Sequence, residues 1–307
     1  MWRSVWFRGA ISLTVLAYLV SRIDMGAALA ALVQVNLGYL AVVLLLVGLD
    51  RAVMIARWLV VLRSSGNETP LKSVAWIFLV SSFIGSALPA SIGGDAARAY
   101  TLARRTDDAS EAVASVAVDR LFGILSLAIL AGLGATVWQT PVTLPVGLIR
   151  LAALLLIGAG ACLLWSDLWA LTLVPKRWHA THLGQSLLGI ADALARYRQR
   201  GTALRGVLAL SVLVQLLRIS QAYLLGLGLG LDVAFGYYLL FMPIGLLMLL
   251  LPVSVAGFGL PQGVIVWLLR PQGVADSLSF ALSTLIVLTG LVGNLPGAWL
   301  YARRKER

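Results

Sequence analysis

Long apolar runs separated by short polar segments dominate the chain. Five of them, at 37–62, 112–137, 141–165, 206–231 and 276–302, approach or exceed the roughly 20 residues that an α-helix needs to cross a bilayer. A shorter run, Gly9–Val20, is flanked by Trp and Arg side chains that extend a short span into the interface. A signal peptide is the alternative for this run, but the small-residue segment after it is a weak cleavage region, so we expect a retained first helix. The pattern predicts an all-α polytopic membrane protein with about six full spans.

Two further apolar regions, 73–97 and 235–269, are interrupted by related motifs. LPASIGGD begins at Leu88 and LPVSVAG at Leu251, and they share Leu, Pro, Ser and the last Gly of each motif. Proline removes a backbone donor and glycine permits turns, so each motif is expected to break its helix. We predict two broken or re-entrant helical hairpins, with Pro89 and Pro252 at the breaks. Ordinary tight turns between full spans are the alternative.

Composition and charge place these elements in a membrane. Hydrophobic residues make up 60% of the chain and charged residues 12%, far from the soluble balance of roughly 45–50% and about 25%. The net charge of +11 comes from Arg and Lys clustered between apolar runs, as the positive-inside rule expects of cytoplasmic loops. Anionic lipid at the cytoplasmic surface, and not nucleic acid, is therefore the expected partner of these charges.

The basic loops also predict orientation. The N-terminus, the loops at 63–72 and 98–105, the stretch at 166–205 and the tail are all expected in the cytoplasm. The two motif regions then enter from opposite sides, so that span, broken hairpin and span recur as an inverted repeat, which points to a transporter's midplane site. We expect one membrane domain, 1–307, divided into a first helix and connection (1–36), a first half (37–137), a linking span and cytoplasmic segment (138–205), an inverted second half (206–302) and a basic tail (303–307).

Several charged residues fall inside predicted spans, where they cost a few kcal/mol and usually face a bundle interior or cavity. Those adjacent in sequence do not face each other along a helix, so they are expected to find partners on other helices or a ligand. Polar residues also recur at helical spacing along one face of 206–231 and one face of 112–137. The intramembrane charges are Asp50, Arg51, Arg57, Asp119, Arg120, Arg150 and Arg218, and the stripes are Ser211, Gln215, Arg218 and Gln221, and Ser115, Asp119 and Ser126.

Hairpin tips with exposed N–H groups and helix N-termini are suited to an anion such as phosphate. Asp95 is expected either to cap the helix that follows it or, with Asp119, to couple to protons or act in gating. The predicted substrate-binding residues are Arg57, Arg98, Arg120, Arg218, Ser91, Gly93, Gly94, Ser254, Gly257 and Gly259.

Motifs for catalysis are scarce. His179 and His182 form an HxxH without an accompanying ligand pattern, and we find neither a P-loop nor a nucleophile elbow. The single Cys162 cannot form an internal disulfide and is expected to serve packing. No catalytic residue, cofactor or metal is expected, and the protein is not expected to be an enzyme.

Four segments together resemble a known family: RAVMIARWLVVLR (51–63), SSFIGSALPASIGGDAARAYTLARR (81–105), VAVDRLFGIL (116–125) and LPVSVAGFGLPQGVI (251–265). They are similar to the lysylphosphatidylglycerol synthase transmembrane region family, also called flippase-like or UPF0104 proteins. The residues that match the family pattern are Pro89, Gly93, Gly94, Asp95, Arg98, Asp119 and Arg120. Where the family commonly has Arg-Glu after the second motif, this chain has Pro261-Gln262, which suggests a different substrate.

The resemblance implies a multi-pass protein of the bacterial or archaeal inner membrane, and we expect the bacterial one. The basic loops place both termini in the cytoplasm. The resemblance also implies a stand-alone member without the soluble synthase domain. The expected function is a flippase or transporter for an anionic, phosphate-bearing lipid, such as a polyprenyl-phosphate-linked, hopanoid or phosphatidylglycerol-type lipid. The alternatives are a membrane-embedded transferase acting on a polyprenyl phosphate and a non-transporting partner of an envelope lipid synthesis complex.

Overall fold

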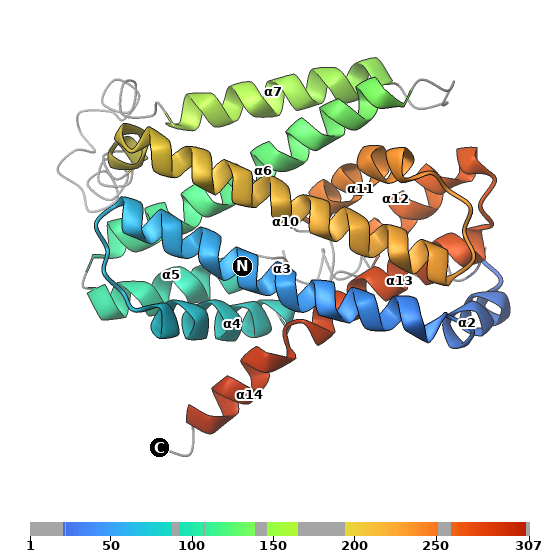
Figure 1. The fold of residues 1–307 in the computed structure, drawn as a ribbon, viewed down its shortest axis with the longest axis horizontal. Coiled ribbons are helices and arrows are strands. Elements are labelled where there is room, and N and C mark those ends of the chain that lie inside the picture. The colour runs from blue at the N-terminus through green and yellow to red at the C-terminus, as the bar shows by residue number, and fades with distance from the viewer. Residues whose placement is uncertain are drawn as a thin grey trace.

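All regular secondary structure in the described part of the chain is helical. The computed structural model describes residues 21, 23–87, 92–106, 108–138, 146–164, 194–250 and 259–304. Figure 1 shows a bundle of elongated helices lying close to one common axis. Its helices are α2 (Met25–Val33), α3 (Leu37–Ser64), α4 (Leu71–Ala87), α5 (Ile92–Thr106), α6 (Ala109–Val137), α7 (Val146–Leu164), α10 (Gly201–Gly228), α11 (Phe235–Leu250), α12 (Leu260–Leu269), the 3₁₀ turn η2 (Arg270–Gln272), α13 (Asp276–Val292) and α14 (Leu295–Arg304).

Four of the predicted spans are confirmed as segments long and apolar enough to cross a membrane. They are Leu37–Ser64, Ala109–Val137, Gly201–Gly228 and Asp276–Arg303. Large apolar side chains on their outer faces are exposed, Leu45 of α3 by 76%, as expected of a surface that meets lipid. The predicted span 141–165 corresponds to the shorter apolar α7, and Gly9–Val20 lies outside the described residues.

Polar side chains fix where several helices begin. Asp24 accepts a hydrogen bond from the Ala27 amide, and Asn36 accepts one from Gly38 at 2.9 Å. Asp108 accepts one from Glu111 at 2.8 Å, so it caps α6. Each of these carboxylate or amide oxygens satisfies an amide that the first helical turn leaves without a partner.

The long helices α3 and α10 lie side by side and antiparallel (Figure 1). The start of α3 meets the end of α10, where the Asn36 amide donates to the Gly228 carbonyl at 3.0 Å. Two apolar cores pack against this pair. One gathers around Trp58, Phe78 and Leu102 from α3, α4 and α5, and the other around Tyr237 and Phe241 of α11 together with α12 and α13.

Each motif segment lies between two helices that pack against each other. Helix α4 ends at Ala87 and α5 begins at Ile92, and α11 ends at Leu250 before α12 begins at Leu260. The ten-residue α12 extends only about 15 Å, which is half of a hydrocarbon core. The segments between these helices lie outside the described residues, so the breaks, the re-entrant path and the inverted repeat stay predictions. The motif residues Pro89, Ser91, Pro252, Ser254 and Gly257 lie outside the described residues.

Two interpretations of the sequence are wrong in detail, and one confirmed span has an added feature. Helix α5 begins at Ile92, so Asp95 lies in its first turn and is not its N-cap. The last span, although long and apolar enough to cross a membrane, contains a turn at Gly293–Asn294, after which α14 turns away from α13 (Figure 1). Cys162 is exposed on the outer face of α7 and does not pack in the interior.

Candidate functional site

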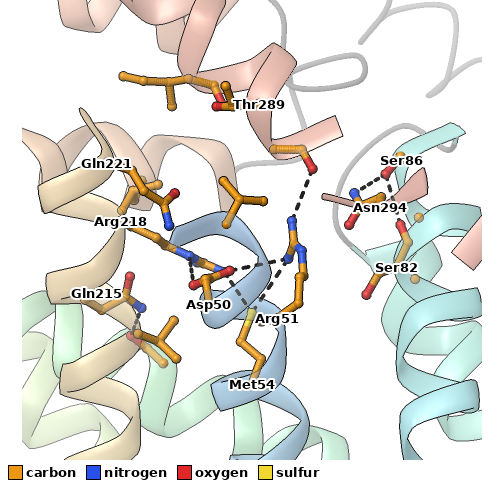
Figure 2. Close-up of a pocket in the computed structure, with 18 of the residues that line it drawn as sticks. Asp50, Arg51, Met54, Ser82, Ser86, Gln215, Arg218, Gln221, Thr289 and Asn294 are labelled. Atoms are coloured by element: carbon orange, nitrogen blue, oxygen red, sulfur yellow. Dashed lines mark hydrogen bonds and ion pairs between the residues drawn. The ribbon is translucent and has the colours of Figure 1, made fainter. Parts of the chain in front are cut away.

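A cavity of about 380 Å³ lies between the two cores and is lined by side chains from α3, α4, α5, α6, α10, α11 and α13. Figure 2 shows Asp50 and Arg51 of α3 in the centre, with α10 on the left, α4 on the right and Thr289 of α13 above. Its wall is mixed: charged groups project from α3, α5, α6 and α10, whereas Leu127, Val214, Leu225, Met242 and Leu246 give it an apolar side. Such a wall suits a ligand with both a polar and an apolar part.

The first charged group of the cavity, which we call the central cluster, consists of Asp50, Arg51 and Arg218. Asp50 lies half-way along α3 and is 3% exposed. Its carboxylate accepts a hydrogen bond from Arg218 Nε of α10 at 3.1 Å and lies 3.7 Å from Arg51 (Figure 2). Arg51 also donates to the carbonyl of Gly290 in α13 at 3.2 Å. The central cluster thus joins three helices at the middle of the bundle.

The second group, the Asp119 cluster, lies two turns further along α3 and contains Arg57, Asp95, Arg98, Asp119 and Arg120. Asp119 is 1% exposed, and its two oxygens accept from Arg57 Nε at 2.7 Å and from Arg98 at 3.0 Å. Asp95 is shared in the same way, since it lies 3.4 Å from Arg98 and 2.5 Å from Arg120. Each carboxylate therefore holds two guanidinium groups from different helices or turns.

Aromatic rings complete the surroundings of Arg98. Its guanidinium carbon lies 5.0 Å from the ring centroid of Trp58 and 5.4 Å from that of Phe78. Both distances are within cation–π range. The indole of Trp58 in turn donates to Ser115 at 3.4 Å, so the ring is held by a residue of the predicted α6 stripe.

The charges that line the cavity do not balance. The described residues that line it include five arginines and three aspartates, which leaves an excess of two positive charges. Some polar atoms at the cavity also have no hydrogen-bond partner within the described structure: Arg51 Nε, Arg98 Nε, Gln215 Oε1, Gln221 Nε2 and Asn294 Oδ1. Buried polar groups are normally satisfied, so these atoms are positioned to meet a ligand or water.

Most of the predicted charged residues come together at this cavity. Arg57, Arg98, Arg120, Arg218, Asp95 and Asp119 all line it, and so does Gly94. The α10 stripe also faces it through Gln215, Arg218 and Gln221, while Ser211 accepts from Arg57 at 3.2 Å. Arg150 lies elsewhere and donates to the Ala135 carbonyl at 2.8 Å.

The predicted glycines have other local environments. A Cβ on Gly94 would lie 2.9 Å from the Ser81 carbonyl oxygen and 3.2 Å from the Cα of Gly85, so this glycine lets α5 approach α4. Gly93 lies in the first turn of α5 and is not among the lining residues. Gly259 caps α12 at a φ of 107°, and its amide donates to Gln262 at 2.7 Å. It too is absent from the lining, and a role for these glycines in binding stays a prediction.

Sequence reasoning missed several lining residues. It recognised Asp50 and Arg51 as intramembrane charges without placing them in the binding site, and it did not consider Ser82, Ser86 or Asn294. Asn294 donates to the Ser86 hydroxyl at 2.5 Å (Figure 2). The Gly-Asn-Leu-Pro-Gly sequence at 293–297 was an available signal, since it interrupts the last span with helix-breaking residues.

Metal ligation finds no support in the described part of the chain, where no group of three His, Cys, Asp or Glu side chains comes together. The pair His179 and His182 lies outside the described residues. The ionisable chemistry at the cavity is therefore that of guanidinium and carboxylate groups.

Comparison with known families identifies a membrane family for this helical bundle. The model of the lysylphosphatidylglycerol synthase TM region matches residues 5–297, nearly the whole chain. No curated protein matches the sequence. Because the match extends through every helix that contributes to the cavity, this multi-pass membrane protein belongs to the lysylphosphatidylglycerol synthase TM region family.

Proposed function

We propose that this protein is a lipid transporter that carries a phosphate-bearing lipid across the inner membrane of a bacterium. The observation that carries the proposal is the cavity, whose described lining has five arginines and three aspartates, most of them in helices long enough to cross a membrane. Unbalanced guanidinium groups are costly in an apolar medium unless an anion compensates them. A lipid headgroup with a phosphate supplies that compensation.

The cavity has arginines beside an apolar wall, and this combination favours a lipid over a free ion. Arg98, Arg120 and Arg218 would hold the phosphate, with Arg57 beside them. The apolar wall formed by α10 and α11 would accept the upper part of the acyl or prenyl chain. The tail itself would stay in the bilayer. Amides and hydroxyls of the two motif segments, at Ser91 and Ser254, would add donors at the headgroup.

Asp95 and Asp119 are suited to gating. Asp119 joins α6 to α3 through Arg57 and to α5 through Arg98, so an arriving phosphate that competes for either arginine would loosen one helix contact. Rocking of the two halves against each other would then give alternating access. In this scheme both termini are cytoplasmic, and anionic lipid contacts the basic loops.

A membrane-embedded transferase is the principal rival. It needs a carboxylate free to act as a base, yet Asp95 and Asp119 are each bound by two guanidinium groups. This arrangement favours holding and gating over proton abstraction, and it supports a protein that is not an enzyme.

The test is lipid movement in liposomes. The purified chain is reconstituted with a fluorescent phosphatidylglycerol, polyprenyl phosphate or phosphatidylcholine, and an external quencher reports the protected fraction. We expect movement of a phosphate-bearing anionic lipid, its loss in Arg98→Ala, and no change in Arg150→Gln. Absence of movement for every lipid, in protein whose melting temperature shows that it is folded, would overturn the proposal.

A further inference from the structure

The charge balance of the cavity narrows the class of lipid, and this inference rests on the proposed transport function. All three carboxylates are already shared: Asp119 between Arg57 and Arg98, Asp95 between Arg98 and Arg120, and Asp50 between Arg51 and Arg218. Guanidinium groups stay charged at every accessible pH. The surplus of two positive charges therefore cannot be matched within this set of side chains.

The surplus is also divided between two depths. The Asp119 cluster has three arginines for two carboxylates, and the central cluster has two for one. Asp50 and Arg57 are both in α3, seven residues apart, which corresponds to about 10 Å along the helix. One extra positive charge thus lies at each end of a cavity that a single headgroup can occupy.

Open hydrogen-bond donors follow the same division. Arg98 Nε in the Asp119 cluster has no partner within the described structure, and the Arg98 residue is 4% exposed. At the central cluster, Arg51 Nε and Gln221 Nε2 are open in the same sense. A ligand with several anionic oxygens satisfies donors at both positions, whereas a singly charged diester neutralises only half of the surplus.

The two motif segments add no charge to this count. The motif segments 88–91 and 251–258 contain no ionisable residue in their sequence. No histidine is among the described residues that line the cavity, whose ionisable groups are Asp50, Arg51 and Arg57 of α3, Asp95 and Arg98 of α5, Asp119 and Arg120 of α6, and Arg218 of α10.

We infer that the transported lipid ends in a phosphate monoester or a diphosphate, which carries about two or more negative charges at neutral pH. A glycerophospholipid diester, with one negative charge, and an aminoacylated lipid, whose amine adds a positive charge, both leave the surplus uncompensated. The terminal phosphate is the feature recognised, and its dianionic charge sets the preference.

Binding measured at two pH values tests whether the ligand is a dianionic phosphate, because the charge of a phosphate monoester changes between them. The second pKa of a phosphate monoester is near 6, so about a tenth of it is dianionic at pH 5.0 and nearly all at pH 7.5. We expect farnesyl phosphate to bind the full chain in detergent roughly tenfold more tightly at pH 7.5 than at pH 5.0. A short-chain phosphatidylglycerol should bind more weakly, with a pH change below about twofold, because its diester does not titrate in this range.

The direction of this pH effect distinguishes protonation of the ligand from protonation of the protein. Protonation of any cavity carboxylate at low pH would add positive charge and tighten anion binding. Weaker binding on acidification therefore comes from the loss of ligand charge. Binding is followed as the ligand-dependent rise in melting temperature, with farnesyl diphosphate as a further probe that distinguishes a diphosphate preference from a monophosphate preference.

Two matched variants change the surplus in opposite directions. Arg218→Gln lowers it to one charge and should reduce the preference for farnesyl phosphate over the diester by about tenfold, the effect of one lost charge-assisted contact. Asp50→Asn raises it to three and should keep or increase that preference. Arg150→Gln, on the outside of the bundle, should leave the preference unchanged.

The outcomes distinguish this inference from the function on which it rests. Movement of phosphatidylglycerol in liposomes, with diester binding as tight as that of farnesyl phosphate at both pH values, would overturn the dianion class and leave transport standing. Tighter, pH-dependent binding of farnesyl phosphate without movement of any lipid would support the ligand class and overturn transport. If wild type and Arg218→Gln had the same preference for farnesyl phosphate over the diester, the cavity charge would not be the cause of that preference.

Discussion

The Nε–H group of Arg57 in α3 donates a hydrogen bond to the Asp119 carboxylate of α6 at 2.7 Å, and both side chains are nearly inaccessible to solvent. A buried charge that loses its partner costs about 3–5 kcal/mol. We therefore expect Asp119→Asn to lower the stability of the solubilised protein by this amount, because Arg57 and Arg98 both lose their counter-charge. Thermal unfolding in detergent measures the effect.

A double-mutant cycle isolates the pair. Arg57→Gln combined with Asp119→Asn removes both charges, so the double variant should be less destabilised than the sum of the two single variants. Strict additivity would show that Arg57 and Asp119 do not stabilise each other. Arg150→Gln serves as the control for loss of an arginine outside the cavity.

Close contact between α4 and α5 predicts a second effect. A Cβ on Gly85 would lie 2.9 Å from the Cα of Gly94, with backbone and no flexible side chain in the way. Gly85→Ala should therefore force the helices apart and cost about 1–3 kcal/mol, and it should slow lipid movement because Gly85 and Gly94 both line the cavity. Thermal unfolding and the quenching assay report the two effects.

Gly48 in α3 provides the matched control, since an added Cβ there meets nothing within 4 Å. Gly48→Ala should be neutral or stabilising by up to about 1 kcal/mol, as expected for alanine in a helix interior. Equal destabilisation by both substitutions would show that the contact between Gly85 and Gly94 is not the cause.

How far the sequence could predict this site depended on the kind of signal. The spans and the intramembrane charges were accessible, because hydrophobic length and the cost of buried charge are local properties of the sequence. The pairing of Asp50 with Arg218, 168 residues away, was not. It depends on the antiparallel contact of α3 with α10, which one sequence does not encode as a local pattern.

Helix boundaries were a second source of error. The predicted cap at Asp95 failed because Ile92, Gly93 and Gly94 continue the helix, a conformation that the glycines disfavour locally and that packing on α4 stabilises. Asn294 was missed because it lies within an apolar span, although the Gly-Asn-Leu-Pro-Gly sequence at 293–297 signals a break there. The structure shows the result as the separate directions of α13 and α14.

A third prediction concerns the segment before α10, where the Tyr197 hydroxyl donates to the buried Glu111 carboxylate of α6. Arg196 reaches the other oxygen of Glu111 at 3.1 Å. Tyr197→Phe should cost about 1–3 kcal/mol, because it removes a donor from a buried carboxylate. Tyr100→Phe is the control, since Tyr100 is 62% exposed and its change should stay within about 0.5 kcal/mol.

The same tyrosine predicts a dependence on pH. Burial, and next the charge of Glu111, raise the pKa of Tyr197 well above its ordinary value. A raised pKa means that the neutral hydroxyl stabilises the folded state below the unfolded pKa of about 10, and that this contribution is lost as pH rises beyond it. The stability difference between wild type and Tyr197→Phe should be constant from pH 6 to about pH 9 and decrease above about pH 10. A difference that grows with alkaline pH would contradict the assignment.

The break between α13 and α14 predicts the last effect. Asn294 donates to Ser86 of α4 at the edge of the cavity, and Arg51 of the central cluster holds the Gly290 carbonyl one turn earlier. An anion in the cavity that attracts Arg51 would compete with the bond of Arg51 to α13, so the cavity charge and this junction are connected.

Asn294→Ala should lower stability by about 1 kcal/mol and also slow lipid movement severalfold. Combining it with Ser86→Ala should add less than the sum of the two single effects in both measurements. Thr136→Ala, on an exposed part of α6, should change neither. If Asn294→Ala lowered stability without any change in lipid movement, the junction would serve packing alone and the connection through Arg51 would have no part in transport.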